Sequence, residues 1–203
     1  MTGLLGGFER VARGAVWVSG LALIALAVLV SVDVICRKWL GVTLAGSDEI
    51  SGYVLACAAA WGYSFCLLRR GHIRIDVIYN LVGPRAQRIL DLLGLLALLV
   101  FMALLTHRAV GVLAKTLDSG AVSNTPLLTP LWIPQSLWVA GLIFFTATLA
   151  LVTARTILLL VRRDYAGVGA LAGIPSVAEE IAAEVPAGMR ACRDGEEGPA
   201  CRR

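Results

Sequence analysis

Four long apolar runs divide this chain, and they constrain its fold more than any other feature. They cover residues 15–35, 50–68, 89–113 and 132–161. The hydrocarbon core of a bilayer is about 30 Å thick and an α-helix rises about 1.5 Å per residue, so a span needs about 20 apolar residues. The sequence therefore predicts an all-α integral membrane protein with four transmembrane helices.

The composition argues in the same direction. The chain is 58% hydrophobic and 16% charged, whereas soluble domains are about 45–50% apolar and about 25% charged. The net charge of +4 comes mostly from Lys and Arg in the short segments between the runs. That distribution is typical of membrane orientation, and no basic stripe with interleaved aromatic residues indicates nucleic-acid binding.

The basic residues are unequally distributed between the loops, which predicts the orientation. The first loop carries Arg37 and Lys38, and the third carries Lys115. The N-terminal segment, the second loop and the tail carry many more: Arg10, Arg13, Arg69, Arg70, Arg74, Arg85, Arg88, Arg162 and Arg163. Because positively charged loops stay on the cytoplasmic side, we expect a multi-pass protein of the bacterial inner membrane with both termini in the cytoplasm.

Three parts follow from these runs. We expect a cytoplasmic N-terminus over residues 1–14, a four-helix transmembrane domain over 15–163 and a cytoplasmic tail over 164–203. The tail is rich in Gly, Ala and Glu and has no aromatic residue after Tyr165. Such a composition predicts a largely disordered segment, with one short helical candidate near 176–185.

The loops carry signals of their own. Residues 72–82 combine apolar and polar side chains at helical spacing, which predicts an amphipathic helix on the cytoplasmic surface between the second and third spans. Gly83 ends this segment, and Pro84 suits the first position of the next helix. Three prolines predict a stiff, extended approach to the fourth span: Pro126, Pro130 and Pro134.

Residues that could carry chemistry are few. His72 and His107 lie on opposite sides of the membrane in the predicted topology, and no cysteine pair has CxxC spacing. No phosphate loop, GxSxG or HExxH motif occurs. The sequence therefore predicts no enzyme and no metal or cofactor site.

Three ionisable residues lie near the predicted outer ends of spans, namely Asp33, Glu49 and Arg108. Near a membrane surface such groups can reach water or headgroups without a partner. Alternatively, Arg108 pairs with an acid, either in this chain or on another subunit.

Small residues recur every four positions in the second span, at Gly52, Ala56, Ala60 and Ser64. Small side chains let two helix backbones approach closely within a membrane. The stripe predicts association, either within the same bundle or with a different subunit.

Several motifs together resemble the DctQ-like small membrane subunit of TRAP (tripartite ATP-independent periplasmic) transporters. Asp48 and Glu49 open the second span, as in that family. Residues 68–76 (LRRGHIRID) resemble the family stretch R-x-G-H-I-x-x-D, and residues 130–134 (PLWIP) are similar to its Pro/Trp approach to the fourth span. The resemblance covers roughly residues 10–163.

The resemblance implies an accessory role in a secondary transporter that imports an organic acid. A large multi-span subunit would hold the transport site, and a periplasmic substrate-binding protein would deliver the substrate. The small subunit would pack against the large one and scaffold it through subunit-packing residues: Glu49, Gly52, Ala56, Ala60 and Ser64. The family motif would shape the turn into the surface helix: Gly71, His72, Ile73 and Asp76. The outer loops would offer contacts for the binding protein: Trp39, Pro130, Trp132 and Pro134.

Two other functions compete with this one. A self-sufficient channel or transporter, formed by homo-oligomers, would need a polar face on one span. The candidates are the threonines of the fourth run: Thr146, Thr148, Thr153 and Thr156. A membrane enzyme or redox protein would need convergent acids, paired histidines or paired thiols, and the sequence shows no such arrangement.

Overall fold

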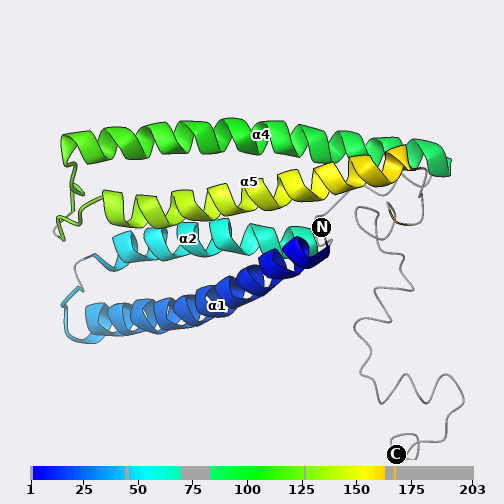
Figure 1. Cartoon of the computed structure of the whole chain (residues 1–203). Helices are drawn as coiled ribbons and strands as arrows, with labels where there is room; N and C mark the ends of the chain where they lie inside the picture. Colours follow the sequence, from blue (N-terminus) through cyan, green and yellow to red (C-terminus); the bar gives the residue numbers. More distant parts are fainter. Residues whose placement is uncertain (1, 44–45, 70–82, 126, 163–166, 168–203) are drawn as a thin grey trace, which may run out of the picture. The chain divides into compact units, whose positions relative to one another are not determined.

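The computed structural model describes residues 2–43, 46–69, 83–125, 127–162 and 167. Four helices occupy them (Figure 1), and each is long and apolar enough to cross a membrane. They are α1 (Thr2–Trp39), α2 (Ser47–Leu68), α4 (Pro84–Ser119) and α5 (Trp132–Val161). The predicted all-α membrane fold with four spans is confirmed. The amphipathic helix predicted over 72–82 and the helical candidate near 176–185 lie outside the described residues.

Two helices, α1 and α4, are much longer than the apolar runs that predicted them. α1 begins at Thr2 rather than near residue 15, and Glu9 pairs with Arg13 one turn later at 2.9 Å, a spacing that supports a helix. α4 begins at Pro84, as predicted, and continues to Ser119. It ends at Gly120, whose φ of 58° is left-handed and closes the helix at its C-cap. Hydropathy marks where a helix is apolar, whereas capping and local pairs set where it ends.

The helices pack in the order α1, α2, α5, α4. α1 packs on α2, α2 on α5 and α5 on α4, while α1 touches α5 only slightly (Figure 1). α2 and α5 therefore lie inside the series, and α1 and α4 are its outer helices. The buried apolar core comes from α2, α4 and α5: Ala60, Leu67, Leu95, Met102, Ala109, Val139, Leu142, Phe145, Leu149 and Val152.

The segment before α5 differs from the predicted extended approach. Val122 and Pro130 form an isolated antiparallel bridge, and the backbone N–H of Ser123 donates to the Thr129 carbonyl at 2.9 Å. Pro134 lies within the first turn of α5, so the prediction was wrong for this residue. An N–H is not needed in a first helical turn, which is why proline is tolerated there.

Candidate functional site

A buried carboxylate joins the end of α1 to the start of α2. Asp33 is 2% exposed. Its Oδ2 accepts hydrogen bonds from Arg37 Nη2 at 2.8 Å and from Ser47 Oγ at 3.1 Å. The Arg37 side chain is more than half exposed, so the charge of Asp33 is compensated from the surface side. Asp33 therefore has a structural partner and does not simply reach toward water.

Glu49 joins α2 to the loop between α4 and α5. Its carboxylate accepts hydrogen bonds from the Tyr53 hydroxyl at 2.6 Å and from the Thr125 hydroxyl. Thr125 also shares a 2.8 Å hydrogen bond with Ser123, which is buried. Glu49 was predicted as a subunit-packing residue, and the structure shows that its carboxylate already has partners within the chain.

The two loops at this end of the bundle also touch through Gly46 and Leu127. Gly46 has a φ of 93°, and a Cβ at this position would collide with the Leu127 side chain. Only glycine permits both that backbone conformation and that approach. We name this region, comprising the described residues of 33–53 and 119–134, the loop end.

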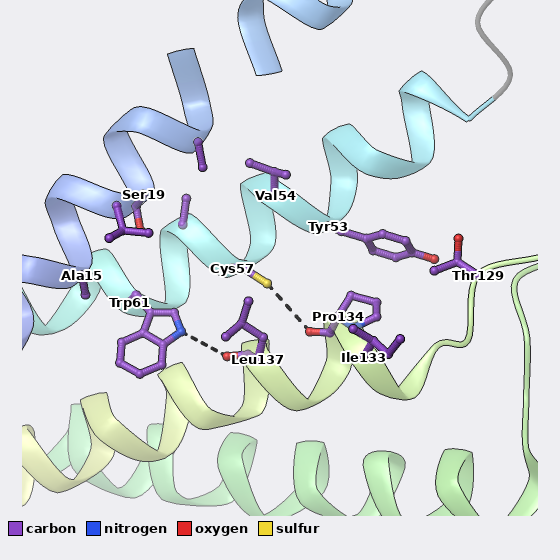
Figure 2. Close-up of a pocket in the computed structure, with 13 residues that line it drawn as sticks. Ala15, Ser19, Tyr53, Val54, Cys57, Trp61, Thr129, Ile133, Pro134 and Leu137 are labelled. Atoms are coloured by element: carbon purple, nitrogen blue, oxygen red, sulfur yellow. Dashed lines mark hydrogen bonds between the residues drawn. The ribbon is translucent and has the colours of Figure 1, made fainter. Parts of the chain in front are cut away.

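An apolar groove of about 550 Å³ runs between α1, α2 and the start of α5 (Figure 2). Two polar side chains on its wall already bond to backbone carbonyl oxygens. The Cys57 thiol lies 3.8 Å from the Pro134 carbonyl oxygen, and Trp61 Nε1 donates to the Leu137 carbonyl at 3.1 Å (Figure 2). Such a lining suits hydrocarbon rather than an ion or a polar solute.

The small-residue stripe of α2 divides between two environments. Ala60 and Ser64 are buried, whereas Gly52 and Ala56 are exposed. A Cβ on Gly141 of α5 would lie 3.0 Å from the Ala60 Cβ, so α2 and α5 approach closely at this level. One half of the stripe packs within the bundle, and the role of the other half stays a prediction.

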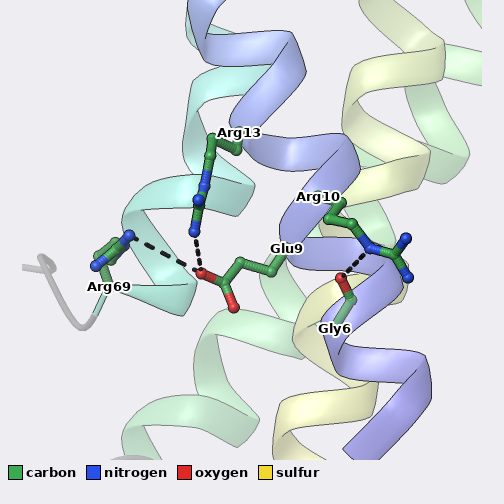
Figure 3. Close-up of polar contacts among 5 residues, drawn as sticks. All are labelled: Gly6, Glu9, Arg10, Arg13 and Arg69. Carbon is green, nitrogen blue, oxygen red and sulfur yellow. Dashed lines mark hydrogen bonds and ion pairs between the residues drawn. The ribbon is translucent and has the colours of Figure 1, made fainter.

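Contacts at the opposite end hold the start of α1 against α2. Glu9 pairs with Arg13 at 2.9 Å and lies 3.9 Å from Arg69, which follows α2 (Figure 3). Arg10 donates to the Gly6 carbonyl oxygen at 3.4 Å in the same figure. These groups are partly exposed, as is usual for surface ion pairs of modest strength.

Aromatic rings add an apolar link deeper in the bundle. The rings of Phe8 and Phe144 stack with centroids 5.2 Å apart, and Trp61 stacks on Phe144 at 5.6 Å. The three rings join α1, α5 and α2 in one tier. Sequence analysis did not find this tier, because nothing in the spacing of the three residues along the chain relates them.

The remaining predicted site residues are distributed as follows. Trp39 is 80% exposed and Trp132 is 46% exposed; Pro130 is also exposed, while Pro134 lines the apolar groove. Gly71, His72, Ile73 and Asp76 lie outside the described residues. The loop end thus presents Trp39, Pro130 and Trp132 on its surface, and their contact with a binding protein remains a prediction.

Within the described residues, no group of three or more His, Cys, Asp or Glu side chains is arranged to hold a metal ion. The polar side chains at the loop end bond to one another and connect helices to loops. Fold and site together define a multi-pass membrane protein whose loop end is held together by hydrogen bonds between helices and loops.

A comparison of the sequence with models of protein families identifies the family of this chain. The model of the family "Tripartite ATP-independent periplasmic transporters, DctQ component" matches residues 10–163, most of the chain. This chain belongs to that family. The family provides the small membrane component of transporters that also contain a large membrane subunit and a periplasmic binding protein, and it is a transporter family rather than an enzyme family. Searches of curated proteins and of solved structures find no match to this chain.

Proposed function

We propose that this chain is the small accessory membrane subunit of a secondary TRAP transporter that uses an ion gradient to import an organic acid. It packs against the large membrane subunit, scaffolds it in the inner membrane, and presents its loop end to the periplasmic binding protein. The observation that carries this proposal is the family match over residues 10–163.

The geometry supports an accessory role. The polar groups of the loop end connect helices within the chain, as Asp33 does with Arg37 and Glu49 with Thr125. The outer helices α1 and α4 expose many large apolar side chains, which suits burial against lipid or another membrane protein. Transport substrates with carboxylates need several convergent donors, whereas two donors on the groove wall, the Cys57 thiol and the Trp61 indole, already bond to carbonyl oxygens of this chain.

The threonines of α5 do not support the alternative of a homo-oligomeric channel. Thr146, Thr148 and Thr156 donate hydrogen bonds to carbonyl oxygens of their own helix. Thr148, Thr153 and Thr156 are also buried within the chain. Threonines in membrane helices commonly bond in this way, so they do not form the exposed polar face that a pore would require.

The test is purification of the tagged chain from its native membranes in a mild detergent, with mass spectrometry of the proteins that accompany it. Recovery of one much larger membrane protein in near-equal amount is expected. Recovery of the chain only with itself would instead favour the homo-oligomeric channel and sink the accessory role. Loss of organic-acid uptake on deletion of the chain, restored by its return, would connect the complex to transport.

A further inference from the structure

A stripe of exposed residues runs along α4 and carries two basic side chains among apolar and small residues. Its positions recur every three or four residues, and we name them the outer stripe of α4: Leu90, Gly94, Ala97, Phe101, Leu104, Arg108, Val112 and Lys115. The side of α4 that packs on α5 carries the buried residues Leu95, Met102 and Ala109, which lie about a third of a turn round the helix from the stripe. The outer stripe is therefore part of the α4 surface that the described part of this chain leaves open.

Arg108 is the unusual member of the stripe. It is exposed between Leu104 and Val112, and within the described residues it makes no hydrogen bond or ion pair. Arg108 lies inside the apolar run 89–113, and ionisable groups within membrane-spanning segments usually face protein and pair with one another. We therefore expect Arg108 to pair with an acidic group outside α4.

A lipid headgroup is the weaker candidate for that partner. Lys115 lies on the same stripe seven residues nearer the end of α4, which is about 10 Å along the axis. Lys115 is therefore the better placed of the two to reach headgroups with a long side chain. Arg108 lies two turns deeper, where a carboxylate on a neighbouring membrane helix is the matching group.

The other outer helix has a different character. The exposed face of α1 includes Trp17, Leu21, Ile24 and Val28, and residues 14–32 contain no ionisable side chain. A helix face of this composition needs only lipid. Of the two outer helices, α4 is therefore the better candidate for contact with another membrane protein.

We propose that the outer stripe of α4 binds a membrane-spanning helix of another chain, and that this helix carries a carboxylate that pairs with Arg108. This inference rests on the function proposed above, under which the other chain is the large subunit. Gly94 belongs to the stripe and Gly111 lies next to its residue Val112. A Cβ at either glycine would meet no atom within 4 Å, so a partner backbone has room to approach. A second copy of this chain fits less well. Two copies share one membrane orientation, which would place their Arg108 side chains at the same depth, where they repel.

The location of the interface is tested by photo-crosslinking in the native membrane. A photoreactive phenylalanine analogue replaces Leu104 or Val112 on α4, and the controls carry it at Leu21 or Val28 on α1. All four positions are exposed in this chain. Adducts with the large subunit from the α4 positions, and not from α1, are expected. Adducts from α1 alone, with a second copy of this chain, or with lipid alone would overturn the proposal.

The ion pair is tested by the variants Arg108→Glu and Arg108→Lys, with Lys115→Glu as the matched charge reversal. Recovery of the large subunit, normalised to the amount of this chain in the membrane, is expected to fall about tenfold or more for Arg108→Glu. Arg108→Lys should retain part of the complex and Lys115→Glu most of it. Unchanged recovery with Arg108→Glu would overturn the pairing.

The two proposals fail in different ways. If the unaltered chain recovers no larger membrane protein, the accessory function itself is wrong. If it does recover one, while the α4 positions give no adduct, only the assignment of this interface is wrong.

Discussion

Trp61 of α2 donates a hydrogen bond from its indole Nε1 to the Leu137 carbonyl oxygen of α5 at 3.1 Å. One turn further along α5, a Cβ on Gly141 would lie 3.0 Å from Trp61 Cδ1 and 3.0 Å from the Ala60 Cβ. The indole therefore fits only because residue 141 has no side chain. This contact fixes how closely α2 and α5 pack. Trp61 also lines the apolar groove and stacks on Phe144 in the aromatic tier.

The change Gly141→Ala tests that contact. The added methyl group meets the short, rigid Ala60 side chain, so α2 and α5 must separate. We expect the free energy of unfolding to fall by about 1–3 kcal/mol, the usual cost of overpacking. Unfolding of the purified chain by titration with a denaturing detergent, followed by circular dichroism, measures it.

A matched control for this change is Gly20→Ala in α1. A Cβ at Gly20 would meet no atom within 4 Å, and alanine is the better helix former. Stability equal to or slightly above that of the unaltered chain is expected. Equal effects of the two changes would show that α2 and α5 do not pack as closely as described.

The second prediction concerns Glu49 and the loop that it holds. Glu49→Ala removes the acceptor for the Tyr53 and Thr125 hydroxyls, so the loop over residues 120–131 should loosen. Hydrogen bonds to a charged acceptor are stronger than those between neutral groups, although the partial exposure of the Glu49 carboxylate to solvent weakens these two. Faster amide hydrogen exchange in the loop is the expected readout. Asp48→Ala, at an exposed neighbour, should leave exchange unchanged.

The third prediction concerns the ion pair between Arg37 and Asp33. Arg37→Ala removes a charged donor from a buried carboxylate and should destabilise the chain. The effect is expected to be about 1 kcal/mol, because the Arg37 side chain is 54% exposed and solvent screens the pair. Adding Asp33→Asn to Arg37→Ala should recover part of the loss, since the buried charge is then gone. Lys38→Ala serves as the control, and an equal loss from it would refute the pairing.

Much of the fold was predictable from the sequence because lipid imposes a simple rule on it. A span must be long, apolar and helical, so hydropathy alone locates the four helices. Pro84 at the start of α4 was also predictable, since its fixed φ suits that position. The extension of α1 toward the N-terminus and that of α4 toward Ser119 were not, because they depend on local pairs and caps that hydropathy does not detect.

The contacts of the site were harder to predict. Glu49 and Tyr53 are four residues apart on one helix, a spacing that could have suggested their hydrogen bond. Thr125, however, is 76 residues away from Glu49, and only the packing of the loop brings them together. The sequence predicted the small-residue stripe of α2. It did not predict that Ala60 and Ser64 are buried whereas Gly52 and Ala56 are exposed. Positions four apart on an α-helix turn by about 40° at each step, so Gly52 and Ser64 face different surroundings.

The fourth prediction is the orientation in the membrane. A periplasmic reporter such as alkaline phosphatase, fused after Thr125, should be active, and the same fusion after Arg162 should be inactive. The physical reason is that the second loop and the start of the tail carry more Arg than the loop end does, and positively charged segments stay in the cytoplasm. The reverse pattern of activity would place the loop end in the cytoplasm and remove the basis for its contact with a binding protein.

The last prediction separates folding from assembly at the exposed half of the α2 stripe. Gly52→Leu adds bulk where a Cβ would meet no atom within 4 Å, and Ala56→Leu adds it at another exposed position. The isolated chain should therefore keep its stability, in contrast to Gly141→Ala. If the large subunit packs on this surface, recovery of the complex from native membranes should still fall, because the added side chains keep the two backbones apart. Stable variants that recover the complex in full would restrict the role of the stripe to the contact between Ala60 and α5.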